Sequence, residues 1–153
     1  MRDAKWAILT LALASCAQQR FALAPVGSVS AARAEGPAIA VRVEDEWLAG
    51  WLALADDADP HGGFVLHLRS AVDEPLLLAW DEARLEGEDH RALPFVSATP
   101  PAATLGPRAH LTVIIPPTID VAPSGPVVLS LPASRGSASR TFYFRARLVA
   151  ISR

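Results

Sequence analysis

Proline recurs along this chain too often for long helices to form. Thirteen of the 153 residues are proline, and each one lacks the backbone N–H that a helix interior requires. Between the prolines, apolar and polar residues alternate with a period of two, which is the pattern of strands that bury one face. The sequence therefore predicts many short strands joined by turns.

Five segments show this alternation, and each is expected to be a strand. They are residues 39–43, 64–69, 109–115 before two prolines, 127–131 between Pro126 and Pro132, and 142–148. The side chains expected to share an inward face are Ile39, Val41 and Val43, then Phe64, Leu66 and Leu68, and finally Phe142, Phe144, Ala146 and Leu148.

Two further segments, 47–57 and 76–86, fit either a helix or a strand. The second consists of good helix formers between Pro75 and Gly87, as a helix would. A lone helix would need its own surface to pack on, so we favour strands for both segments. The result is about seven short strands in fewer than 120 residues, which is typical of a single antiparallel immunoglobulin-like β-sandwich. We expect this all-β domain to cover residues 38–153.

The N-terminus has the parts of an export signal. Basic Arg2 and Lys5 precede an apolar run over residues 6–14, which is shorter than the roughly 20 residues of a membrane-spanning helix. Small residues follow, as at a cleavage site. We expect residues 1–15 to be a signal peptide.

The cleavage zone, Leu13-Ala14-Ser15-Cys16, resembles the lipobox of bacterial lipoproteins. The resemblance implies that Cys16, the single cysteine, receives a diacylglyceryl group and becomes an acylated N-terminus, which anchors the protein stably to a membrane. Alanine rather than aspartate at position 17 implies, by the same resemblance, transport to the outer membrane. The alternative is an ordinary secretory peptide cut after Ala17, which would remove Cys16.

Residues 16–37 lack periodicity and are rich in alanine, serine, glycine and proline. We expect them to form a flexible tether between the lipidated cysteine and the domain. About 20 flexible residues would average roughly 25 Å end to end, so the domain would stand clear of the lipid surface.

The stretch 64–90 is similar to a pattern found in small bacterial envelope lipoproteins and related immunoglobulin-like modules. In that pattern a strand and a turn are followed by an apolar strand that ends in Trp80-Asp81, and Leu-Gly-Pro at 105–107 continues it. Ser-Ala stands at 70–71, where an asparagine is common. The group has no established activity, so the resemblance implies a fold and no chemistry.

The metal-binding patterns in the chain are incomplete. Residues 57–62, Asp-Ala-Asp-Pro-His-Gly, open like an EF-hand calcium loop, but Leu68 stands where that loop needs a bidentate glutamate. The histidines, at positions 61, 67, 90 and 110, lack the spacing of a zinc or copper site. We therefore expect no metal and no cofactor other than the covalent lipid.

Catalytic motifs are missing as well. The sequence contains no G-x-S-x-G serine motif and no glycine-rich phosphate loop. Adjacent carboxylates such as Asp81 and Glu82 would face opposite sides of a strand, which does not suit a glycosidase pair. We expect no catalytic residue and no enzymatic activity.

Charge is distributed unevenly. Residues 35–59 carry seven acids and one arginine, whereas residues 121–153 carry five arginines and no acid. Two interpretations stay open. In the first, the opposite charges on the exposed faces of the first and last strands complement each other. In the second, Tyr143, Arg145 and Arg147 form an exposed strip for an anionic partner such as lipid headgroups, a glycan or an acidic protein.

These features favour a lipid-anchored, non-enzymatic module of the cell envelope, an accessory or binding subunit that holds an envelope protein partner through its sandwich surface or an edge strand. The alternative is a periplasmic hydrolase or a small-ligand-binding protein whose site is dispersed along the sequence. The formal net charge of −2 disfavours binding to nucleic acid. The sequence carries no signal for an oligomeric state.

Overall fold

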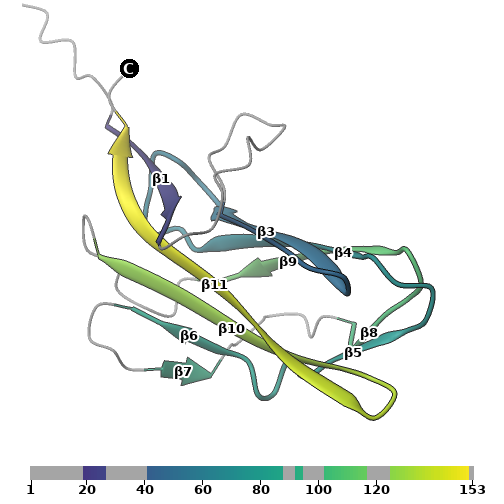
Figure 1. Ribbon diagram of the computed structural model, residues 1–153. Coiled ribbons are helices and arrows are strands. Elements are labelled where there is room, and N and C mark those ends of the chain that lie inside the picture. Colours follow the sequence, from purple (N-terminus) through teal and green to yellow (C-terminus); the bar gives the residue numbers. More distant parts are fainter. Residues whose placement is uncertain (1–18, 27–40, 88–91, 95–101, 117–124, 152–153) are drawn as a thin grey trace, which may run out of the picture.

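Alternating apolar residues bring this chain together as two antiparallel β-sheets that pack face to face (Figure 1). The structure, a computed structural model, describes residues 19–26, 41–87, 92–94, 102–116 and 125–151, and only the backbone of 92–94. These residues form strands and turns, and they include no helix long and apolar enough to cross a membrane. The prediction of an all-β, immunoglobulin-like sandwich is confirmed.

Eleven strands lie in the described residues. They are β1 (Arg20–Pro25), β2 (Val41–Glu44), β3 (Leu48–Leu54), β4 (Phe64–Ser70), β5 (Leu76–Leu78), β6 (Arg84–Glu86), β7 (Ala92–Pro94), β8 (Thr104–Leu105), β9 (His110–Ile115), β10 (Pro126–Arg135) and β11 (Ala138–Ile151). Sheet A has the order β1-β11-β10-β5-β8, with β6 paired to β10 and β7 to β6, and sheet B has the order β2-β3-β4-β9. The number exceeds the expected seven because β5, β6, β7 and β8 have only two or three residues each.

Both ambiguous segments contain strands, as favoured. Segment 47–57 contains β3. Segment 76–86 contains β5 and β6, separated by a tight turn in which the N–H groups of Glu82 and Ala83 donate to the carbonyls of Ala79 and Trp80. The helix-forming residues of this segment do not form a helix, because β5 and β6 both pair with β10 instead.

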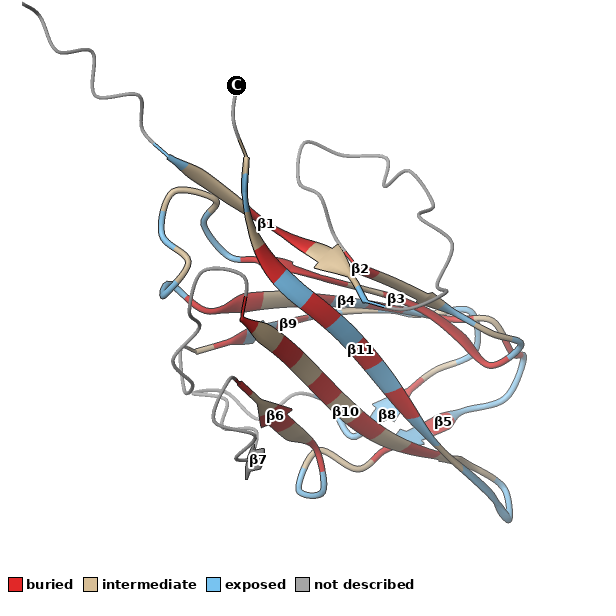
Figure 2. Cartoon of the chain, turned by 60° about the vertical axis from the view of Figure 1, so that its left-hand side comes forward, coloured by how far each residue is buried: buried red, intermediate tan, exposed pale blue. Residues whose placement is uncertain are grey.

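The faces predicted from the alternation are confirmed where the structure describes them. In β4 the three predicted inward residues are buried, whereas His67 and Arg69 are exposed. Buried and exposed residues alternate in the same way along most of β11 (Figure 2). Phe64 and Phe144 are the largest fully buried side chains, and they help to fill the core between the sheets. Ile39 lies outside the described residues.

The strand expected at 127–131 is longer than predicted, because β10 includes both flanking prolines. Pro126 begins the strand. Pro132 lies between the ladders that β10 forms with β6, at residues 128–130, and with β5, at residues 133–134. The carbonyl of Pro132 accepts a hydrogen bond from the N–H of Ala79. The nitrogen of Pro132 points to the same side of β10 as this carbonyl, and there the chain between β5 and β6 turns away from β10. Proline is tolerated there because it removes no ladder hydrogen bond.

The prediction of a flexible tether over residues 16–37 is wrong for residues 20–25. These residues form β1, which pairs with the end of β11, so that Arg20 lies opposite Ile151 and Pro25 opposite Ala146. Leu23 is fully buried in the core. The folded domain therefore begins before residue 38, because an apolar strand in this segment completes the edge of sheet A.

Candidate functional site

The predicted strip of Tyr143, Arg145 and Arg147 lies on the outer face of sheet A. All three side chains are exposed, and Tyr143 retains 49% of its surface. The guanidinium of Arg145 lies 5.0 Å from the centroid of the Tyr143 ring. Within the described part of the chain, neither Arg145 nor Arg147 forms an ion pair.

The interpretation of complementary charges holds for another arginine of the same strand. Arg140 forms ion pairs with Asp45 at 2.8 Å and with Glu46 at 2.6 Å, and its guanidinium lies 4.5 Å from the Trp47 ring centroid. Hydrogen bonds to Asp45 and then to Glu46 raise the pKa of Arg140 above its ordinary value. Arg135, on β10, likewise pairs with an acid, Glu74. Unlike Arg135 and Arg140, the two arginines of the strip have no acidic partner in the described residues.

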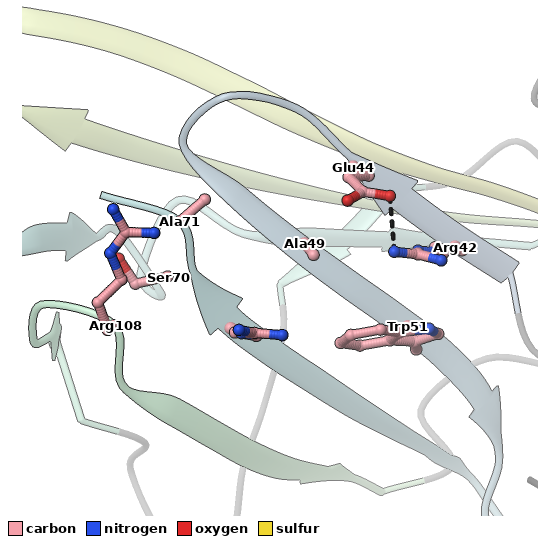
Figure 3. Close-up of a pocket in the computed structure, with 8 residues that line it drawn as sticks. Arg42, Glu44, Ala49, Trp51, Ser70, Ala71 and Arg108 are labelled. Atoms are coloured by element: carbon pink, nitrogen blue, oxygen red, sulfur yellow. Dashed lines mark ion pairs between the residues drawn. The ribbon is translucent and has the colours of Figure 1, made fainter. Parts of the chain in front are cut away.

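A second feature is a hollow of about 610 Å³ on the outer face of sheet B. We call it the Trp51 groove (Figure 3). Its lining consists of Arg42, Glu44, Ala49, Trp51, Arg69, Ser70, Ala71 and Arg108. The strand register brings these residues together. Arg42 on β2 lies opposite Trp51 on β3, and Ala49 on β3 lies opposite Arg69 on β4.

Arg42 is held over the indole of Trp51, with its guanidinium 5.4 Å from the ring centroid. One of its terminal nitrogens forms an ion pair with Glu44 at 2.6 Å (Figure 3). Its Nε–H is buried and has no hydrogen-bond acceptor among the described residues. An unsatisfied buried donor costs on the order of 1–3 kcal/mol, so the fold keeps Arg42 in this position at a cost.

Arg108 reaches the groove from a turn with unfavourable backbone geometry. The N–H of Ala109 donates to the carbonyl of Gly106, and Arg108 has φ of 54°, in the third position of a turn that has proline in the second. This is the type II arrangement, whose third position favours glycine. Arg108 also binds Asp73 at 2.7 Å, and this hydrogen bond lowers the pKa of the Asp73 carboxyl.

Arg69 is the arginine of the groove without a counter-charge. It is exposed on β4, and it forms no ion pair with any described residue. The neighbouring Ser70 is fully buried, and its hydroxyl is within hydrogen-bond distance of the backbone of Val72. Ser70 therefore positions the end of β4, and the free positive charge of the groove belongs to Arg69.

The calcium-like segment 57–62 forms the turn between β3 and β4. Asp56 and Asp59 accept backbone N–H groups of this turn, and Asp57 pairs with Arg20 at 2.7 Å. The carboxylates thus hold the turn itself. In the described part of the chain, no three histidine, cysteine or acidic side chains lie close enough together to hold a metal ion.

Two further histidines lie on the neighbouring strands β4 and β9 of sheet B. His67 lies on the outer face of sheet B, with Nδ1 3.0 Å from the Thr112 hydroxyl, and His110 is exposed on β9. The predicted lipidation site, Cys16, the sorting residue Ala17 and His90 lie outside the described residues.

Sequence reasoning missed the Trp51 groove because its residues come from four separate segments. One signal was present: Arg42 interrupts an apolar stretch at a position that alternation places on the outer face. A comparison of the chain with protein-family models, curated proteins and solved structures finds no match.

Proposed function

We propose that this chain is a lipid-anchored, non-enzymatic module of the bacterial cell envelope that holds an acidic protein partner at the strip of Tyr143, Arg145 and Arg147. The observation that carries the proposal is the contrast in charge pairing. Arg140 is neutralised within the domain, whereas Arg145 and Arg147 have no acidic partner among the described residues. An acidic protein surface would supply the missing counter-charges.

The surroundings of the strip favour a protein as the occupant. Tyrosine and arginine are enriched in protein interfaces and contribute much of their binding energy. On the same face of sheet A, Leu77 is 55% exposed beside a shallow hollow of about 460 Å³ that Pro132 and Thr141 also line. Because β11 is paired on both sides, by β1 and β10, the partner would contact side chains of the sheet face rather than add a strand.

The early start of the fold shortens the tether in this proposal. Cys16 lies four Cα steps before Arg20, the first residue of β1, and four steps reach at most about 14 Å. A lipidated Cys16 would therefore hold the start of β1 and the end of β11 within that distance of the lipid. The domain would lie against the outer membrane, to which Ala17 directs it by resemblance, instead of standing clear of it.

Labelled palmitate is expected to be incorporated into this chain in cells, and Cys16→Ser is expected to abolish the label. The reason is that the thiol is the group that would accept the lipid. Immunoprecipitation followed by autoradiography measures the label, and Ser15→Ala, which keeps a small residue in the lipobox, should retain it. Label that persists in Cys16→Ser, or an unmodified mature chain that begins at Gln18 in the soluble fraction, would overturn the anchor.

Reversal of the strip charges, by Arg145→Glu with Arg147→Glu, is expected to abolish recovery of the partner. In-cell crosslinking of the lipidated protein followed by mass spectrometry measures this. The matched control, Arg69→Glu with Arg108→Glu, changes the charge equally on the opposite face of the sandwich and should leave recovery unchanged. If both double variants keep the partner, or if the wild-type chain reproducibly recovers none, the strip is not the docking surface.

A further inference from the structure

The Trp51 groove and the strip lie on opposite sides of the sandwich, because the groove is on the outer face of sheet B and the strip on the outer face of sheet A. A ligand in the groove would therefore not compete with a partner on the strip. The groove volume of about 610 Å³ is in the range of small-ligand pockets, roughly 300–1,000 Å³. The groove is therefore a second candidate site, separate from the strip, and it would have a ligand of its own.

The charge of the groove points to an anion. Three arginines and one glutamate line it, although the chain as a whole has a formal net charge of −2. Glu44 neutralises Arg42, and Asp73 neutralises Arg108 at the rim. Arg69 keeps its charge, and a guanidinium binds a carboxylate with two parallel hydrogen bonds.

The apolar part of the groove is a single aromatic side chain with small neighbours. Trp51 is partly exposed between Ala49 and Ala53, which lie on the same face of β3. Both alanines are buried, so the exposed part of the indole is the main apolar surface that the groove offers to a ligand. The negative face of an indole attracts the slightly positive C–H groups that line one face of a sugar ring.

Two features of the groove lower the stability of the domain. Arg42 keeps a buried Nε–H that has no acceptor in the part of the chain that the structure describes, and Arg108 has a left-handed backbone conformation with φ of 54°, which favours glycine. Costs of this kind collect at functional sites, where surrounding structure maintains them. The terminal N–H groups of both arginines are partly exposed, and a ligand rich in oxygen atoms would accept hydrogen bonds from them.

We propose that the Trp51 groove binds an acidic saccharide, a sugar ring that carries a carboxylate. The carboxylate lies against the guanidinium of Arg69, and C–H groups of the ring contact the part of the Trp51 indole that Arg42 leaves exposed. Ring hydroxyls accept hydrogen bonds from Arg42 and Arg108 and donate to the Glu44 carboxylate. The open, mainly polar lining suits a sugar, whose hydroxyls remain partly hydrated, better than a compact apolar ligand.

The test uses trigalacturonate as the probe and galactotriose as its neutral counterpart. The full chain is purified in a zwitterionic detergent without a sugar headgroup, and binding is measured by calorimetry. We expect trigalacturonate to bind at least tenfold more tightly than galactotriose, because the neutral sugar lacks the group that Arg69 recognises. Inorganic phosphate, which has the charge but no ring, should bind at least tenfold more weakly than trigalacturonate.

Variants separate the two contacts. Arg69→Gln should weaken trigalacturonate binding about 10- to 100-fold, the loss typical of a hydrogen bond to a charged group. Trp51→Leu should weaken the binding of both trigalacturonate and galactotriose. Arg108→Gly should lower the affinity without lowering the melting temperature, because glycine relieves the left-handed backbone. Arg135→Gln, on β10 of the opposite sheet, should leave the affinity unchanged.

Three results would overturn the site. They are the absence of trigalacturonate binding to the folded wild-type chain, equal binding of inorganic phosphate, and equal affinity of Arg69→Gln and Arg135→Gln for trigalacturonate. Each is measured without a protein partner and does not depend on lipidation, so failure of the groove and failure of the proposed docking function are told apart.

Discussion

Gly50→Ala is expected to lower the free energy of unfolding by about 1–3 kcal/mol, the usual cost of overfilling a packed core. Gly50 lies in the middle of β3 and faces the other sheet. A Cβ atom added there would lie 2.7 Å from Cζ of Phe144 and 3.0 Å from Cδ2 of Leu68. Phe144 is fully buried, so its ring has no solvent to move into.

A partner substitution tests the steric cause. Phe144→Leu, which removes the obstructing ring atoms, should make Gly50→Ala less costly, so the double variant loses less stability than the sum of the single ones by at least about 0.5 kcal/mol. Urea unfolding followed by circular dichroism measures all three. Gly106→Ala is the matched control, because its Cβ would meet only Ala109 at an ordinary 3.7 Å. Equal stability of Gly50→Ala and Gly106→Ala would contradict the close packing of the sheets at this point.

The parts of the fold that the sequence predicts well are those decided by the residues of one strand. The faces of β4 and β11 follow from alternation alone, because a strand with one buried face must alternate. The course of β10 through Pro132 could not be predicted in this way. Whether proline is tolerated there depends on the chain opposite, which turns away between β5 and β6.

Of the two candidate sites, the strip could be predicted from one strand, whereas the groove depends on how several strands pair. Tyr143, Arg145 and Arg147 lie two residues apart on one strand, so their common face could be predicted without a structure. The Trp51 groove needs the pairing of β2, β3 and β4 and the turn at Arg108. No local pattern shows that Arg42 lies beside Trp51, because strand register is a property of the whole sheet.

Strand β1 lies in a segment that the sequence predicts to be a flexible tether. Alanine, serine, glycine and proline dominate residues 16–37, and this composition indicates a linker. Phe21 and Leu23 nevertheless alternate with Ala22 and Ala24, which is a strand pattern only four residues long. Small alanines on the outer face conceal it, and the stability comes from burial against distant parts of the chain rather than from local propensity.

Leu23→Ala is therefore expected to lower the free energy of unfolding by about 2–5 kcal/mol, the range for a buried leucine truncated to alanine. Leu23 is fully buried and lies opposite Leu148, which is also fully buried. A domain of this kind has a total stability of about 5–15 kcal/mol, so the loss would be a large fraction of it. Urea unfolding of the full chain measures the change.

The matched control is Val26→Ala, just beyond β1, where the side chain is 39% exposed and truncation should change stability by no more than about 0.5 kcal/mol. Amide hydrogen exchange gives a second measurement, because Leu23→Ala should expose the N–H groups at the end of β11 that face β1. If Leu23→Ala and Val26→Ala are equally stable and exchange alike, residues 20–25 are not part of sheet A. In that case a long segment would separate a lipidated Cys16 from the domain, whereas a stable β1 would leave only three residues between a lipidated Cys16 and the first strand.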